Sequence, residues 1–413
     1  MESCEKRLKV LLIAYACEPN RGSEPGTGWN MALGLAQEYD VTVVTRANNR
    51  LVIESYLDGF SGLKPSFIYI DPADWVLWFK KAGILPVQLF YAMWQRRVKQ
   101  CLGPDETSKF DLVHQLTFNS FEVPPYVLGG ICAKKVWGPI GGGQRVPLGM
   151  LPAFGLLGGL REFIRNLRVL LSAKRGRNRT IFRQCDLVVF ANRETRELLE
   201  PFCLRNTSFQ IDVGVDSARF LPAKVQVESE GATILFAGRL EPRKGLILLL
   251  RAFEICQSSI EHARLRVVGD GPDRAKLTRF VKRKKLENSV SFVGFVDHSE
   301  MVREFEKADV FAFPSLRDTS GAIVLEAMAM KLPVVCFNHQ GAALMVEEGC
   351  GIKVDASNCN SAVEGMASAL LRLLGDDRRR KNMGERARST VVEHYDWKAK
   401  VEVISEQYRI LMD

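Results

Sequence analysis

The sequence predicts an α/β protein made of two doubly wound domains, each built on a parallel sheet. Short, continuously apolar segments alternate with segments of helical periodicity along the whole chain. Continuous apolar strands separated by helices are typical of parallel sheets whose two faces are both covered by helices. Two such series occur, and the polar stretch 215–231, which contains a proline, lies between them. We therefore expect two Rossmann-like domains joined near residue 215.

Each expected strand is a short apolar run. In the first series the strands are expected at 9–16, 41–47, 66–70, 112–117, 135–140, 187–191 and 209–215. In the second series they are expected at 233–238, 264–270, 290–295, 309–315 and 332–337. These strands predict an N-terminal domain over 1–215 and a C-terminal domain over 216–390. The charged tail 391–413 has apolar positions at helical spacing, which predicts a helix that packs back on the N-terminal domain.

Composition narrows the class of protein. The chain has 413 residues, of which 46% are hydrophobic, so sizeable cores are expected and wholesale disorder is not. The net charge of +9 suggests an anionic partner but does not choose among a phosphate ligand, a nucleic acid and a membrane surface. The ten cysteines form no C-x-x-C pair and have no histidine at zinc spacing, which favours reduced thiols in a cytoplasmic protein without a metal site. The apolar run VLLIAYA is interpreted as a first strand, and no segment is apolar enough to predict a membrane span.

Two cations follow the strand at 233–238. Gly238 and Arg239 come at its end, and Lys244 is expected at the N-terminus of the next helix. A cation at this end of a helix opposes the helix dipole, so the stretch FAGRLEPRKG indicates an anion site. An ordinary solvated turn is the alternative.

A second candidate stretch spans 313–335. Its flexible turn contains Thr319, Ser320 and Gly321, and the helix that begins with Gly321 and Ala322 directs backbone amides at any phosphate placed there. Asp318 is expected in the loop before that helix. Glu326 is expected on its second turn, where apolar neighbours argue for burial; a solvated helix carboxylate is the alternative.

Several glycines also mark strand ends. Gly269 lies in a turn whose glycines favour a structural role, and Gly294, followed by Phe295, would let the backbone approach a flat ligand such as a base. Gly26 and Gly28 are expected in a loop over a ligand, before a helix that starts near residue 28 or 29. The third glycine of the dinucleotide fingerprint is missing there, which disfavours a dinucleotide oxidoreductase.

His114 lies in the apolar strand at 112–117. One histidine in an apolar strand is more often a core residue than a catalyst, so both interpretations stay open.

These motifs resemble the retaining glycosyltransferases of family four, which have the GT-B architecture. The resemblance is carried by GRLEPRKG (238–245), VVGDGP (267–272), FVGFV (292–296), FPSLRD (313–318) and LEAMA (325–329), which stand in the family's order and spacing. It implies two Rossmann-like domains that face each other across a cleft and close over the donor.

The resemblance also implies roles for individual residues. Arg239 and Lys244 would hold the diphosphate of a nucleotide-diphosphate sugar and stabilise its departure. Glu326 would bind the ribose hydroxyls, and Asp318, where the family usually has Glu, would contact sugar hydroxyls beside the amides of 319–321. The functional histidine of the family would correspond to His114. The remaining donor contacts would come from Gly26, Gly28, Gly238, Gly269, Gly294, Phe295 and Ala322.

The implied activity is transfer of a sugar, with retention, to a saccharide or lipid-linked acceptor in cell-envelope or exopolysaccharide synthesis. A UDP-sugar is favoured over GDP-mannose, and no D-x-D motif stands at a strand end, which suits catalysis without a metal or cofactor. The basic, aromatic or apolar stretches 74–100 and 151–179 suggest contact with an anionic membrane surface from the cytoplasmic side; core helices are the alternative. A sugar-nucleotide epimerase or hydrolase is the nearer rival. A nucleic-acid-binding protein is the other, but the basic runs 174–179 and 376–382 lack interleaved aromatics.

Overall fold

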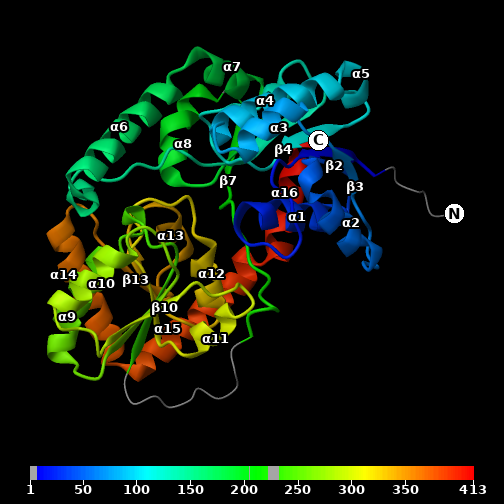
Figure 1. The fold of residues 1–413 in the computed structure, drawn as a ribbon. Coiled ribbons are helices and arrows are strands. Elements are labelled where there is room, and N and C mark those ends of the chain that lie inside the picture. The colour runs from blue at the N-terminus through cyan, green and yellow to red at the C-terminus, as the bar shows by residue number, and fades with distance from the viewer. Residues whose placement is uncertain (1–6, 204, 222–231) are drawn as a thin grey trace. The chain divides into compact units, whose positions relative to one another are not determined.

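The computed structural model describes residues 7–203, 205–221 and 232–413 (Figure 1). The chain divides into two compact units: unit 1 holds the described residues of 1–143, 169–214 and 397–413, and unit 2 holds those of 144–168 and 215–396. Residues 144–168, expected in the N-terminal domain, therefore belong to unit 2, because Val146, Met150 and Phe154 are buried in its core. Residues 391–396 also belong to unit 2. Most of the expected linker, 222–231, lies outside the described residues.

Unit 1 contains a seven-stranded parallel sheet in the order β3-β2-β1-β4-β5-β6-β7. Its strands are β1 (Lys9–Ile13), β2 (Asp40–Thr45), β3 (Ser66–Tyr69), β4 (Leu112–Gln115), β5 (Lys134–Ile140), β6 (Leu187–Phe190) and β7 (Asn206–Phe209). The strand expected at 209–215 is wrong, because the last strand ends at Phe209. The other six expected positions each contain an observed strand.

Helices cover both faces of this sheet. One face carries α1 (Ser23–Leu35), α2 (Arg50–Asp58) and α16 (Trp397–Met412). The other carries α3 (Asp74–Lys81), α4 (Val87–Cys101), α7 (Gly176–Gln184) and the end of α6 (Gly155–Ala173). The short helices α5 (Pro104–Thr107) and α8 (Arg193–Leu199) complete the unit. The C-terminal helix α16 is thus part of unit 1, where Val401 packs against Gly34 of α1.

Unit 2 repeats the topology with six parallel strands in the order β10-β9-β8-β11-β12-β13. The strands are β8 (Thr233–Ala237), β9 (Arg264–Val268), β10 (Val290–Gly294), β11 (Val310–Phe313), β12 (Val334–Phe337) and β13 (Gly351–Val354). The last of these was not expected, since GIKV is a short edge strand with one buried residue.

The helices of unit 2 also form two layers, as Figure 1 shows. The face with the large apolar cluster carries α9 (Leu246–Ser259), α10 (Arg274–Arg283) and α14 (Cys359–Leu374). The remaining helices are α11 (Met301–Glu306), α12 (Ala322–Ala329), α13 (Gln340–Met345) and α15 (Asp377–Thr390). Within the described ranges, no helix is both long and apolar enough to cross a membrane.

The strand order identifies where a ligand of each unit is expected. In unit 2 the connections run outward in opposite directions from β8 and β11, which makes this neighbouring pair the topological switch point. Ligands of open parallel sheets bind at the carboxyl ends of the strands at such a point. The ends of β8 and β11 lead into 238–245 and 314–321, the two stretches singled out from the sequence.

Candidate functional site

The loop after β8 is packed directly on the loop after β11. Gly245 has φ +67°, and a Cβ atom placed on it would lie 2.0 Å from the carbonyl oxygen of Pro314. The Leu316 amide donates to the Arg243 carbonyl at 2.7 Å. A left-handed backbone with no room for a side chain requires glycine at 245, so the two predicted stretches form one continuous surface.

Charged side chains from both loops meet there. Lys244, in the short 3-10 helix Pro242–Lys244, forms an ion pair with Asp318. Arg243, which was not predicted, lies 3.6 Å from Asp318 (Nη1 to Oδ2) and 2.6 Å from Glu241 (Nη2 to Oε1). Arg239 is exposed, and its side chain has no partner in the described part of the chain. Three cations therefore face two carboxylates, which leaves the surface positive beside the N-terminal ends of α9 and α12.

Two glutamines that were not predicted hold the loop around Asp318. The buried Gln340 accepts a hydrogen bond from the Asp318 amide at 2.6 Å and donates to the Leu316 carbonyl at 3.3 Å. Gln144 donates to the Thr319 hydroxyl at 2.8 Å. The signal for Gln340 was present, since it follows the carboxyl end of β12. That for Gln144 was not, because its segment was expected in the other domain.

Helix α12 begins as predicted, after a glycine. Gly321 has φ +88° and Ala322 is the first helical residue, so the N–H groups at this end stand beside the loop with Thr319 and Ser320. Glu326 lies on the second turn and its side chain is 8% exposed. The apolar-neighbour argument for its burial is confirmed.

The Glu326 carboxylate is only half satisfied. Its Oε1 lies 3.0 Å from Nε2 of His298, a residue after β10 that was not predicted. Its Oε2 is buried and has no hydrogen-bond partner among the described residues. Because a bare buried carboxylate oxygen is costly, it marks a position where a ligand donor is expected.

Close packing of the backbone explains the glycines at the ends of β8, β9 and β10. The Gly269 amide donates to the Gly294 carbonyl at 2.7 Å. A Cβ atom on Gly269 would lie 2.0 Å from the Gly238 carbonyl oxygen. The backbones after β8, β9 and β10 thus touch one another, which favours the structural interpretation of Gly269. Phe295, the next residue after Gly294, is 79% exposed.

The loop expected around Gly26 and Gly28 is wrong, because both glycines lie inside α1, which already begins at Ser23. Cβ atoms on them would lie 2.1 Å from the carbonyl oxygens of Arg21 and Ala16, respectively. Glycine lets the helix sit against the chain that leaves β1, so packing accounts for both positions.

His114 is a core residue of unit 1. It is fully buried, with Nδ1 2.5 Å from the Tyr408 hydroxyl and Nε2 2.7 Å from the Gly138 carbonyl oxygen. Burial lowers the pKa of His114 to about 4, so at neutral pH Nε2 donates to the carbonyl and Nδ1 accepts from the hydroxyl. With both ring nitrogens engaged by the fold, the catalytic role expected for His114 gives way to the core interpretation.

Other ionisable side chains of unit 1 have shifted pKa values. Glu24 accepts a hydrogen bond from the Asn119 amide at 2.8 Å, and burial raises the pKa of this carboxyl. The Asn119 side chain donates to Asp212 at 2.6 Å. Lys400 of α16 is buried and donates to the Ile211 carbonyl at 2.5 Å; burial lowers the pKa of this amine to about 7. Among the described residues, no group of three or more His, Cys, Asp or Glu side chains could hold a metal ion.

Comparison with known proteins agrees with this geometry. Residues 218–390 match the family model described as glycosyl transferases group 1. The GDP-mannose-dependent monoacylated alpha-(1-6)-phosphatidylinositol monomannoside mannosyltransferase of Corynebacterium glutamicum is 28% identical over 246 residues, which are 55% of this chain and 63% of that protein. The match therefore spans less than two thirds of that relative's length.

Solved structures resemble nearly the whole chain. Sucrose-phosphate synthase from Thermosynechococcus elongatus has a TM-score of 0.69 at 18% identity, covering 98% of this chain and 99% of that chain. An Anabaena protein solved in complex with UDP has a TM-score of 0.65 at 16% identity, covering 97% and 99%. Identities this low establish the fold alone, and the expected architecture of two Rossmann-like domains is confirmed. Residues 218–390 thus match the glycosyl transferases group 1, and the chain has the GT-B fold.

Proposed function

We propose that the protein is a retaining, metal-independent glycosyltransferase whose nucleotide-diphosphate sugar donor binds to unit 2. One observation carries the proposal: Oε2 of Glu326 is buried and bare, and it lies on the helix that follows the loop whose Asp318 pairs with Lys244. Ribose hydroxyls are donors and that oxygen is an acceptor without a partner among the described residues. A nucleotide therefore supplies what the free protein lacks.

The cations beside Asp318 suit the diphosphate. We assign Arg239 and Lys244 to its oxygens, together with the N–H groups at the start of α12. In the free protein Lys244 is paired with Asp318. Binding would exchange this partner for a phosphate oxygen and turn Asp318 toward the sugar hydroxyls. Developing charge on the leaving diphosphate is then stabilised by fixed cations.

We propose metal independence on the basis of the same charges. Three cations and a helix N-terminus supply the neutralisation that Mg²⁺ provides in other phosphoryl sites, so activity should be unchanged in EDTA. Activity that falls in EDTA and returns with Mg²⁺ would contradict this part of the proposal.

Retention is proposed on the state of the carboxylates. Glu326 is buried against His298, and both Glu326 and Asp318 are assigned to hydroxyl groups of the donor. Neither is therefore placed as a free nucleophile, and we propose that the acceptor attacks the face from which the diphosphate departs. The anomeric coupling constant of the product, measured by NMR, decides: inversion contradicts the assignment.

We favour a UDP-sugar as donor, with GDP-mannose as the alternative. The C. glutamicum relative is named for GDP-mannose, and the Anabaena structure contains UDP. A thermal-shift panel of UDP-, GDP- and ADP-sugars, run on wild type, Arg239→Ala and Lys244→Ala, separates the bases. If no nucleotide stabilises wild type, or the two variants respond like wild type, the donor site is misassigned.

The acceptor is proposed to be a saccharide or a lipid-linked saccharide of cell-envelope or exopolysaccharide synthesis. The rival sugar-nucleotide epimerase or hydrolase needs no acceptor. Rapid conversion of a sugar nucleotide by the protein alone would favour that rival. Turnover that depends on an added acceptor favours transfer.

A second observation favours binding of the protein to a membrane surface. Among the described residues, helix α6 has an exposed apolar face whose side chains are 47–96% exposed and recur at helical spacing: Leu156, Leu157, Leu160, Phe163, Ile164, Leu167 and Leu171. Arg161 and Arg168 follow this stripe along one side. An apolar face edged by cations is typical of helices that lie in the interface of an anionic membrane.

Co-sedimentation with vesicles tests this face. Wild type should pellet with vesicles containing phosphatidylglycerol at low salt, and the triple variant Leu160→Ser, Phe163→Ser, Leu167→Ser should not. Leu51→Ser, at an 82% exposed leucine of α2, is the matched control and should pellet like wild type. If wild type stays in the supernatant at low salt, the proposed membrane binding is contradicted.

A further inference from the structure

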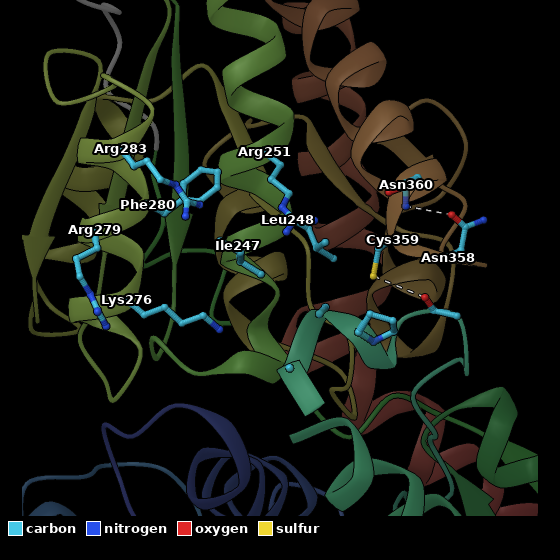
Figure 2. Close-up of a pocket in the computed structure, with 14 residues that line it drawn as sticks. Ile247, Leu248, Arg251, Lys276, Arg279, Phe280, Arg283, Asn358, Cys359 and Asn360 are labelled. Atoms are coloured by element: carbon cyan, nitrogen blue, oxygen red, sulfur yellow. Dashed lines mark hydrogen bonds between the residues drawn. The ribbon is translucent and has the colours of Figure 1, made fainter. Parts of the chain in front are cut away.

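A cavity of about 840 Å³ lies in unit 2. It is enclosed by α9, α10, the N-terminus of α14 and the segment 149–155 (Figure 2). Its lining includes neither Arg239, Lys244 nor Glu326. Its size is that of a pocket for a small molecule.

Every charged residue that lines this cavity is a cation. They come from α9 and α10: Arg251, Lys276, Arg279 and Arg283. In the described part of the chain, none of the four is paired with a carboxylate. The same helices do pair cations elsewhere, since Lys284 lies 2.8 Å from Glu254 and Arg274 lies 3.3 Å from Asp270. The carboxylates Glu254 and Asp270 thus pair with cations outside the lining, and the four cations in the lining give the cavity a concentrated positive field.

The rest of the lining divides into an apolar floor and a polar end. Ile247, Leu248 and Phe280 form the floor, and the Arg283 guanidinium lies 5.5 Å from the centroid of the Phe280 ring. At the opposite end Asn358 and Asn360 stand at the start of α14, as Figure 2 shows. This 16-residue helix directs its positive end at the cavity.

We propose that this cavity is a second ligand site, which binds the phosphate group of a small phosphate ester. Three guanidinium groups offer the planar forks that suit phosphate oxygens, and Lys276 adds a point charge. The apolar floor accommodates the carbon skeleton of the ester. A soluble sugar phosphate and a lipid phosphate share this chemistry, and the site is independent of the proposed donor site.

Calorimetric titration of the full chain tests the proposal with three probes: inorganic phosphate, glucose 6-phosphate and dihexanoyl phosphatidate. At least one ester should bind more tightly than inorganic phosphate because it adds contact with the floor. The tighter of the two esters identifies the source, with phosphatidate marking a lipid ligand and glucose 6-phosphate a soluble one. If neither ester binds wild type, the proposal is overturned.

Variants locate the binding. The double variant Arg279→Gln, Arg283→Gln should bind the ester about tenfold or more weakly, because it loses charged hydrogen bonds. Arg372→Gln, at an exposed arginine of α14 outside the cavity, should leave the affinity unchanged. Lys244→Ala should also leave it unchanged, because that residue belongs to the donor site. Binding that is lost in Lys244→Ala and kept in the double variant would place the ester in the donor site and refute a second site. Circular dichroism melting confirms folding, and Arg251→Gln serves as the replacement if the double variant melts early.

Discussion

Replacing Glu326 by glutamine separates the cost of this carboxylate in the free protein from its use in binding a donor. The side chain is 8% exposed, Oε1 lies 3.0 Å from His298, and Oε2 has no partner among the described residues. Glutamine keeps the shape, removes the buried negative charge and replaces one acceptor by a donor. The substitution therefore acts on stability and on binding in opposite directions.

The magnitudes follow from the two states of Oε2. A buried polar atom without a partner costs about 1–3 kcal/mol, and a neutral amide costs less than a charged oxygen. We expect the free Glu326→Gln protein to gain about 1 kcal/mol, which raises Tm by about 2–4 °C for a domain of the size of unit 2. With a nucleotide sugar, the lost charged hydrogen bonds should cost about 1.5–3 kcal/mol, or about 10- to 150-fold in Kd.

Glu304 provides the matched control, because its side chain is also 8% exposed but is fully paired. Arg266 and Lys307 approach it at 2.5 Å and 3.0 Å. Burial alone would raise the pKa of Glu304, but the hydrogen bonds from Arg266 and Lys307 lower it. Glu304→Gln should therefore lower Tm and leave the donor Kd unchanged. Differential scanning calorimetry and titration with a UDP-sugar measure both quantities. A Glu326→Gln protein that melts earlier and binds the donor like wild type would refute the reasoning.

Three further predictions concern the loops and the buried lysine. Lys244→Ala should weaken donor binding by about tenfold or more through loss of a charged contact, measured by titration, and an unchanged Kd would count against the diphosphate assignment. Gly245→Ala should destabilise unit 2 by more than about 1 kcal/mol in urea unfolding, because a Cβ atom would meet the Pro314 carbonyl oxygen at 2.0 Å; a neutral effect would mean that the two loops are not in contact. Lys400 has a pKa of about 7 in the folded protein against about 10.4 when unfolded, so the unfolded state binds more protons between these values. Wild-type Tm should therefore rise from pH 7 to pH 10 relative to Lys400→Met, and parallel curves would contradict the burial of a neutral amine.

The strands were predictable from the sequence because buried parallel strands leave a local signature. The exception is instructive. FQIDVGV (209–215) alternates apolar residues, and Ile211, Val213 and Val215 are indeed buried. The Gln210 amide still donates to the Phe190 carbonyl at the end of β6, but its side chain donates to the Lys400 carbonyl of α16, and the strand goes no further. The alternating pattern predicted the buried residues correctly. It could not predict that the segment contacts α16, because Lys400 lies 190 residues away from Gln210 in the sequence.

The same limit explains which parts of the candidate site were missed. Arg239, Lys244, Asp318 and Glu326 stand in local stretches at strand ends, where topology brings them to one edge. His298 and Gln340 reach that edge from other strand ends, and their roles depend on contacts over 28 and 22 residues. The prediction of a loop at Gly26 and Gly28 was wrong for a related reason. Glycine permits both an open loop and a helix pressed against backbone, and only the contact with residues 16 and 21 distinguishes them.

What finally separates a binding residue from a core residue here is whether its buried polar atoms are satisfied. His114 and Glu326 both looked functional in sequence, and both are buried near a strand end or helix start. The fold uses both nitrogens of His114, so the residue has nothing left for a substrate. It uses one oxygen of Glu326 and leaves the other bare at a positive edge. Since a protein tolerates such an unpaired group only where something else offsets its cost, the asymmetry itself argues that the missing partner is a ligand.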